Sequence, residues 1–267
     1  MKEGIYLQEF DLVEPFDRLA GRFSSQTLPF FLDSGMLMGG LGRYSFIGCD
    51  PFLTVKAKGR ALCISRGGNE ERINCDPLQF LQRALEENSV PQESYPVPFI
   101  GGAVGYLAYD LGRLIERLPA GPPDDLNLPD MALCFYDVVI AYDHLERRAF
   151  IISTGLPEAP GANRQTRARE RMESARDFLE QSSPVSFAAE TDLELGLLPH
   201  SNFTKEGYLQ AVARAKDYIA SGDVYQVNLS QRFQAPCDTS AWALYERLRG
   251  INPAPFAAFQ DFGDFAV

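Results

Sequence analysis

The sequence predicts an α+β fold, in which two antiparallel sheets form a β sandwich and helices cover the outside. Three observations support this class. Short runs of β-branched and aromatic residues alternate with tight turns, as in antiparallel hairpins. Each candidate helix has one apolar stripe, so each is expected to pack one face on a sheet. The segments do not repeat as strand, helix, strand, which argues against a doubly wound parallel sheet.

Composition narrows the classes of function. The chain has 267 residues, 45% of them hydrophobic, and a formal charge of -11, which suits one large domain or two small ones. The acidic balance argues against a nucleic acid or an anionic membrane as the main partner, but not against an anionic small molecule. No signal peptide is evident and no apolar run approaches the ~18 residues of a membrane span, so a cytoplasmic location is expected. Five scattered cysteines without a C-x-x-C pair argue against a disulfide framework or a zinc site.

The first 70 residues are expected to form one helix and several strands. Residues 12–23 have near-helical apolar spacing, with Pro15 in the first turn. A glycine-rich loop at 39–42 resembles a phosphate cradle, but a strand pattern follows it where a nucleotide site needs a helix N-terminus. A mobile loop between strands is therefore the better account. The expected strands are 30–32, 43–48, 52–57 and 61–65.

The middle of the chain predicts two more helices around a group of strands. Asp76 caps the first helix, Pro77 begins it, and a stripe from Leu78 to Leu85 packs it on the sheet. The glycines within 99–113 let that strand pass close to a neighbour. Strands are expected at 131–142 and 148–153, and a second helix at 162–181. Arginines on that helix interleave with acids and predict a solvated face; they are Arg164, Arg167, Arg169, Arg171 and Arg176.

The last third begins with a polar linker or surface excursion at 182–203. A helix at 204–221 follows, with Tyr208, Val212, Ala215 and Ile219 as its buried stripe and Gly222 as a left-handed cap. A strand is expected to run to Phe233. One face would hold Tyr225, Val227, Leu229 and Phe233 as core. The other would hold Gln226, Asn228, Ser230 and Arg232, which either line a pocket for an anion or satisfy neighbouring backbone groups.

The chain then shows a helix after Ser240, an extended proline segment and a strand at 256–259. A turn at 261–264 leads into a strand of only three residues, which leaves its partner largely unpaired. We therefore expect a truncated domain. The predicted division is an N-terminal region at 1–181, the linker at 182–203, and an incomplete region at 204–267.

Four stretches resemble one family. They are SGDVYQVNLSQRF at 221–233, LDSG at 32–35 with GRYSFIG at 42–48, FIGGAVGYLAYDLGR at 99–113, and NPAPFAAF at 252–259. They resemble the chorismate-utilising enzymes that include anthranilate synthase component I and aminodeoxychorismate synthase component I. The third stretch looks more like the aminodeoxychorismate branch. The resemblance implies the two-sheet fold of anthranilate synthase component I, with residues 204–267 as the start of its chorismate-binding region.

The resemblance also implies a reaction. An aminodeoxychorismate synthase component I would convert chorismate and ammonia to 4-amino-4-deoxychorismate for folate synthesis, with ammonia from a glutamine amidotransferase subunit. Anthranilate formation for tryptophan synthesis is the alternative. In the family, glutamates hold Mg²⁺ and chorismate in a part expected beyond Val267, so we assign no catalytic residue and no metal ligand to this chain. The chain alone is expected to be inactive. A non-catalytic ligand-binding or partner-docking module is the alternative of another class.

One family site can be carried over, a pocket for tryptophan or a similar ligand. Ser34 would accept a hydrogen bond from the ligand's ammonium group, and Pro253, Pro255 and Phe256 would pack its ring. The sequence departs from the anthranilate branch at Asp33, where that branch has Glu, and at Phe256-Ala257, where it has Tyr-Met. Ordinary core and turn contacts are the alternative role for these residues. The matching positions are Asp33, Ser34, Tyr44, Phe46, Tyr225, Gln226, Asn228, Asn252, Pro253, Pro255 and Phe256.

Overall fold

The computed structural model describes residues 4–91, 94–119, 121, 124–181 and 199–267. These residues form two compact units. The larger unit contains the described residues up to 181 together with 241–267, and the smaller unit contains residues 199–240. The predicted division at 182–203 stays a prediction, and its residues 182–198 lie outside the described part.

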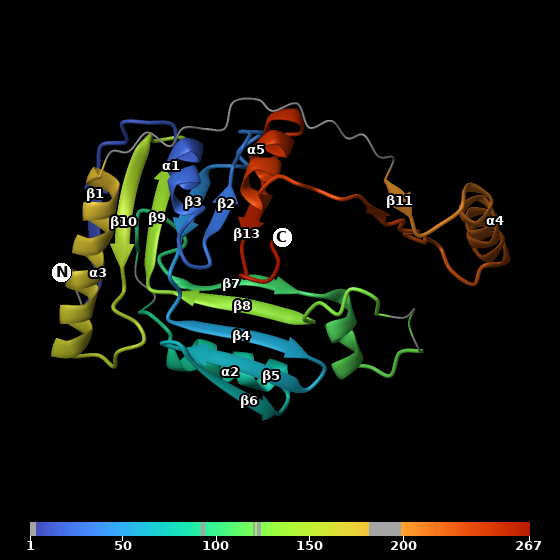
Figure 1. The fold of residues 1–267 in the computed structure, drawn as a ribbon, viewed down its shortest axis with the longest axis horizontal. Helices are drawn as coiled ribbons and strands as arrows, with labels where there is room; N and C mark the ends of the chain where they lie inside the picture. Colours follow the sequence, from blue (N-terminus) through green and yellow to red (C-terminus); the bar gives the residue numbers. More distant parts are fainter. Residues whose placement is uncertain (1–3, 92–93, 120, 122–123, 182–198) are drawn as a thin grey trace. The chain divides into compact units, whose positions relative to one another are not determined.

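The larger unit contains a six-stranded antiparallel sheet (Figure 1). Its order is β1-β10-β9-β3-β2-β13, so strands from both ends of the chain lie in one sheet. The register pairs Phe31 of β2 with Ile47 on one side and with Phe259 on the other. The strands are β1 (Tyr6–Phe10), β2 (Phe30–Asp33), β3 (Tyr44–Gly48), β9 (Val138–Asp143), β10 (Arg148–Ser153) and β13 (Ala257–Gln260).

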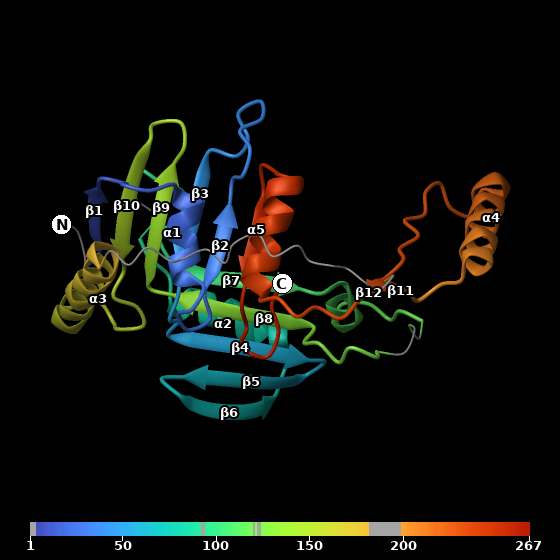
Figure 2. The same ribbon diagram turned by 45° about the horizontal axis from the view of Figure 1, so that its top comes forward.

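A second, five-stranded antiparallel sheet has the order β6-β5-β4-β8-β7. Its strands run across those of the first sheet in both views (Figure 1, Figure 2). The strands are β4 (Leu53–Lys58), β5 (Ala61–Arg66), β6 (Asn69–Asn74), β7 (Gly102–Leu107) and β8 (Met131–Tyr136). The mixed fold with two antiparallel sheets is as predicted. The polar strands β1 and β6 were missed because their side chains are mostly exposed and show no apolar alternation.

The core lies between the two sheets, and a second apolar layer lies outside each of them. Side-chain alternation builds both layers from the same strands. In β8, Ala132, Cys134 and Tyr136 face the shared core, whereas Met131, Leu133 and Phe135 face the outer layer of the five-stranded sheet. In β9, Val139 and Ala141 face the shared core. These strands are buried on both faces, which explains their continuous apolar sequences.

Helices cover the outer faces. α1 and α3 pack on the six-stranded sheet, and α5 packs against β13 (Figure 1). Asp76 caps α2 by accepting from the backbone N–H groups of Leu78 and Gln79, as predicted. The segment 99–113 ends in a short 3-10 helix, η1 (Tyr109–Leu114), where a strand was expected. The α-helices of the larger unit are α1 (Phe16–Phe23), α2 (Pro77–Glu87), α3 (Ala162–Glu180) and α5 (Ala241–Ile251).

The predicted single strand at 131–142 is wrong, because the chain changes sheets at Asp137. β8 ends at Tyr136 in one sheet and β9 begins at Val138 in the other. The Asp137 side chain is fully buried and forms ion pairs with Arg167 and Arg171 of α3, both at 3.1 Å. A buried carboxylate requires such partners. Asp137 thus ties α3 to the point where the two sheets meet.

These contacts also correct the prediction of a solvated arginine face on α3. Arg164 is buried and its Nε donates to the carbonyl of Thr154 at 2.9 Å. Arg167 and Arg171 reach Asp137, so three of the five arginines contact the body of the protein. Only the Arg176–Glu180 pair among those described has the expected i,i+4 form. The spacing of the arginines along the helix gave no indication of these contacts, because their acceptors lie outside the helix.

The smaller unit contains α4 (Lys205–Ser221) and a two-residue ladder of β11 (His200–Ser201) with β12 (Phe233–Gln234). The strand predicted through 225–232 is wrong, since this segment has no regular structure before Phe233. Alternating side chains make a strand only where a sheet edge accepts the backbone. The predicted core face is wrong too, because Tyr225, Val227 and Phe233 are exposed. The predicted stripe of α4 contains no buried residue.

Candidate functional site

Five of the residues predicted for the ligand pocket line one cavity of about 590 Å³, which we call the inner cavity. It lies at the ends of β2, β3 and β13, beside the shared core of the sandwich. Tyr44 and Phe46 stack with ring centroids 6.2 Å apart and form an aromatic wall. Phe256, which is 72% exposed, directly precedes β13. The predicted residues among the lining are Asp33, Ser34, Tyr44, Phe46 and Phe256.

Ser34 is held in place by its neighbours. Its Oγ donates to the carbonyl of Tyr44 at 2.6 Å, and its backbone N–H donates to Ser45 Oγ at 2.9 Å. The hydroxyl proton is therefore used, and the oxygen lone pairs remain available to accept a hydrogen bond. This arrangement suits an ammonium donor in the inner cavity.

The proline segment after α5 runs along the glycines of the 35–42 loop. A Cβ on Gly42 would lie 2.4 Å from the carbonyl oxygen of Met36 and 3.4 Å from Cα of Pro255. Gly42 also has φ +76°, so a side chain there would be both strained and crowded. Pro255 is half-buried, whereas Asn252 and Pro253 are exposed. Gly42 thus serves close packing, whereas a Cβ at Gly39 or Gly40 would have nothing within 4 Å.

The remaining predicted residues belong to the smaller unit. Tyr225 is 92% exposed, and the Nε2 of Gln226 donates to Oδ1 of Asn228 at 3.3 Å. Their contribution to the inner cavity stays a prediction.

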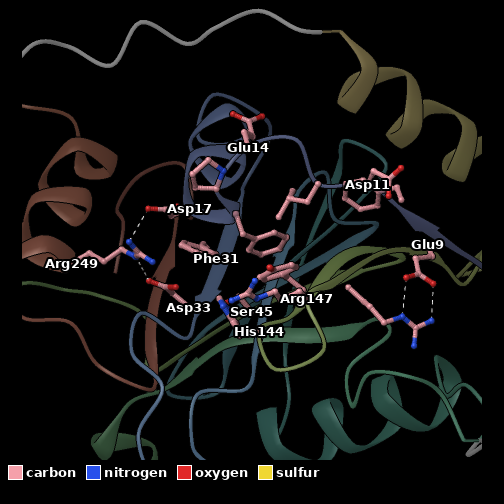
Figure 3. Close-up of a pocket in the computed structure, with 16 residues that line it drawn as sticks. Glu9, Asp11, Glu14, Asp17, Phe31, Asp33, Ser45, His144, Arg147 and Arg249 are labelled. Carbon is pink, nitrogen blue, oxygen red and sulfur yellow. Dashed lines mark hydrogen bonds and ion pairs between the residues drawn. The ribbon is translucent and has the colours of Figure 1, made fainter.

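A cluster of polar side chains on the helix side of the six-stranded sheet was not predicted (Figure 3). Asp33 is 3% exposed, and its Oδ2 accepts from Nε of Arg249 at 2.5 Å and from the hydroxyl of Tyr245 at 3.0 Å. Burial and the adjacent Asp33 raise the pKa of Tyr245, which keeps its hydroxyl protonated as a donor. Arg249 also donates to Asp17 of α1 at 2.8 Å. Asp33 therefore fixes α5, and through it the proline segment, relative to β2.

His144 connects this cluster to Ser34. Its Nε2 is 2.8 Å from Ser45 Oγ, which in turn accepts from the N–H of Ser34. Burial lowers the pKa of His144, and the nearby Asp33 opposes that effect only in part. A neutral imidazole is therefore favoured. His144 lies in the turn after β9, and nothing in the neighbouring sequence signals contact with a serine about a hundred positions away.

The turn that carries His144 is stabilised by an ion pair. Burial alone would raise the pKa of Asp143, but the Arg43 guanidinium and the N–H groups of Glu146 and Leu145 together lower it. Arg43 Nη2 lies 2.7 Å from Asp143 Oδ2. The pair joins the start of β3 to the end of β9, next to the inner cavity.

Within the described residues, no three His, Cys, Asp or Glu side chains converge in a way that could hold a metal ion. We therefore derive no step through Mg²⁺ from this part of the chain. None of the described helices is long and apolar enough to cross a bilayer.

The comparisons with known proteins agree on one group. The family model for chorismate binding enzyme matches residues 43–267. Anthranilate synthase component 1 of Cereibacter sphaeroides is 35% identical over 269 residues, covering 96% of this chain and 53% of that protein. Aminodeoxychorismate synthase component 1 of Bacillus subtilis is 34% identical over 229 residues, covering 85% and 47%.

A solved structure shows the same likeness. The crystal structure of anthranilate synthase component I from Streptococcus pneumoniae matches with a TM-score of 0.69 and 28% identity, over 86% of this chain and 50% of that one. The chain spans about half the length of the curated relatives it matches. Both branches of the group match at similar identity.

Proposed function

The chain belongs to the family of chorismate-binding enzymes, and from that premise we propose that it is the N-terminal portion of an aminodeoxychorismate synthase component I. The intact enzyme would convert chorismate and ammonia to 4-amino-4-deoxychorismate in the cytoplasm, for folate synthesis. A glutamine amidotransferase subunit would supply the ammonia. Anthranilate synthase component I is the alternative, since relatives of both kinds match equally well.

The observation that favours the aminodeoxychorismate branch is the fit of Asp33. This position has Asp where the anthranilate branch has Glu. The carboxylate is enclosed by Arg249, by Tyr245 and by the backbone at Gly35, where a Cβ would lie 3.3 Å from Oδ2. The extra methylene of a glutamate would move the carboxylate away from its contacts with Arg249 and Tyr245. Phe256 supports the same choice, because the anthranilate branch has a tyrosine at this position and phenylalanine lacks its hydroxyl group.

Complementation of auxotrophs tests the branch. The locus that encodes this chain, cloned with its downstream sequence, is introduced into one strain lacking aminodeoxychorismate synthase component I and into another lacking anthranilate synthase component I. We expect growth without p-aminobenzoate in the first strain and continued dependence on tryptophan in the second. The reverse pattern would establish the alternative.

We propose that residues 1–267 alone do not turn over chorismate, because we assign them no magnesium ligand and no acid or base group. Mg²⁺ would supply charge for binding the substrate's carboxylates in the intact enzyme. The purified chain is assayed with chorismate, ammonium and Mg²⁺, and products are separated by chromatography. We expect neither aminodeoxychorismate nor anthranilate, and formation of either would refute this assignment.

A second proposed function is binding of a tryptophan-like ligand in the inner cavity, by Ser34, the aromatic wall and the 252–256 segment. Calorimetry with tryptophan tests it. We expect heat of binding at millimolar ligand and at least tenfold weaker binding for Ser34→Ala, while the exposed Ser89→Ala leaves the affinity unchanged. Absence of heat at millimolar tryptophan would exclude this function for the chain.

A further inference from the structure

A second cavity of about 590 Å³ lies on the helix side of the six-stranded sheet, and we call it the outer cavity (Figure 3). It is lined by α1, the segment before it, β2, the turn after β9, and Arg249 of α5. It shares only Asp33 with the inner cavity. Apart from Asp33, none of the residues that the resemblance placed in a ligand pocket lines this cavity.

Part of its lining is aromatic. Phe16 and Tyr142 stack with centroids 5.4 Å apart, and Phe31 lies 6.2 Å from Phe16. Such rings can pack an apolar or aromatic body, and their faces attract cations.

The rest of the lining carries an excess of negative charge. It contains five carboxylates and three arginine side chains, and one of the carboxylates, Glu14, pairs with Arg22 outside the lining at 3.2 Å. Glu9 pairs with Arg148 at 2.7 Å, whereas Asp17 and Asp33 share the single guanidinium of Arg249. The shared guanidinium leaves one negative charge without a counterion in that group, and the half-buried His144 adds no positive charge when neutral.

One buried oxygen atom in the wall of the outer cavity has no hydrogen-bond partner among the described residues. Asp33 Oδ2 is bound by Arg249 and Tyr245, but the buried Oδ1 has no hydrogen-bond partner among the described residues. Both side chains come from α5, so the carboxylate lies on the helix side, and Figure 3 shows it directed toward Arg249. A buried carboxylate oxygen is stabilised by a charged donor.

We propose that the outer cavity binds a small molecule in which a protonated amine is attached to an apolar or aromatic body. The ammonium group donates to Asp33 Oδ1 and neutralises the excess charge of Asp17 and Asp33. The body of the ligand packs on Phe16, Phe31 and Tyr142. No bond is made or broken, so this is a binding site and not a second catalytic centre.

The test uses two probes of the same shape and opposite charge, phenethylamine and 3-phenylpropionate, titrated calorimetrically into the 267-residue chain at low ionic strength and pH 7.5. We expect phenethylamine to bind at least tenfold more tightly than 3-phenylpropionate. Equal affinity, or tighter binding of the anion, would overturn the proposal.

Variants locate the site. Asp33→Asn and Asp17→Asn should each weaken phenethylamine binding at least fivefold, and Glu70→Gln on β6, which removes an exposed acid of the other sheet, should not. Thermal unfolding checks that each variant is folded. If Asp33→Asn does not fold, Asp17→Asn decides, and wild-type affinity in that variant would contradict the site.

Ser34→Ala separates the two cavities. It alters the inner cavity but keeps the backbone N–H that contacts Ser45, so phenethylamine binding should be unchanged. Loss of amine binding in this variant would place the amine in the inner cavity and refute the proposal. The inner cavity is tested separately with tryptophan, so a negative result for one binding site does not refute the proposal for the other.

Discussion

At Gly105 the strands β7 and β8 lie so close that a side chain has no space. A Cβ there would be 2.0 Å from the carbonyl oxygen of Ala132. We expect Gly105→Ala to destabilise the fold by about 2 kcal/mol or more, because the strands must separate to admit it. Gly112→Ala is the matched control, since nothing lies within 4 Å of its Cβ. Denaturant unfolding measures both, and equal stabilities would contradict the close approach.

His144 should make stability depend on pH. Burial lowers its pKa below the ordinary value of 6.5, so the unfolded chain binds this proton more readily than the folded chain. Its contribution is therefore fully present above pH 6.5 and is lost as the pH falls toward the depressed folded value. We expect His144→Gln to flatten the stability profile between pH 7 and pH 5. An unchanged slope in that window would show that His144 does not titrate as described.

At the scale of elements, Asp137 holds α3 on the six-stranded sheet. Its buried carboxylate pairs with both Arg167 and Arg171, and removing it takes an ion pair from each of these guanidinium groups. We expect Asp137→Ala to cost about 3 kcal/mol or more of unfolding free energy. Asp110→Ala, which breaks the exposed pair with Arg113, should have little effect. Similar losses in the two variants would mean that burial of the pair is unimportant.

Elements with local signals were predictable. The cap at Asp76, the left-handed Gly222 after α4 and the strands at 30–32 and 43–48 depend on neighbouring residues only. The change of sheet at Asp137 was not, because a continuous apolar run looks the same whether it lies in one sheet or two. The strand expected through 225–232 failed for a related reason, since alternation does not supply a pairing edge.

At the scale of the whole molecule, the two units should differ in local stability. α3 buries Ala168 and Met172 against the sheet, whereas α4 has no buried residue. Local opening costs least where few apolar side chains are buried. We expect the amides of α4 to exchange with deuterium much faster than those of α3, as measured by hydrogen-exchange mass spectrometry. Equal protection would show that α4 is stabilised by contacts other than those described.

The candidate site was partly predictable at this scale. The family resemblance grouped Asp33, Ser34, Tyr44, Phe46 and Phe256, which line one cavity although more than two hundred positions separate the first from the last. Arg249, Tyr245 and His144 were missed. Each is an ordinary helix or turn residue in the sequence, and only the pairing of β2 with β13 and β3 brings them to Asp33 and Ser45.

Asp33 belongs to the walls of both cavities, so a ligand in one can change the affinity of the other for its own ligand. An amine that weakened the contacts of Asp33 with Arg249 would loosen α5, and with it the Phe256 side of the inner cavity. By thermodynamic reciprocity, if the first ligand changes the affinity for the second by some factor, the second changes the affinity for the first by the same factor. Through this one buried acid, ligand binding on one face of the six-stranded sheet would change the ligand affinity of the other face.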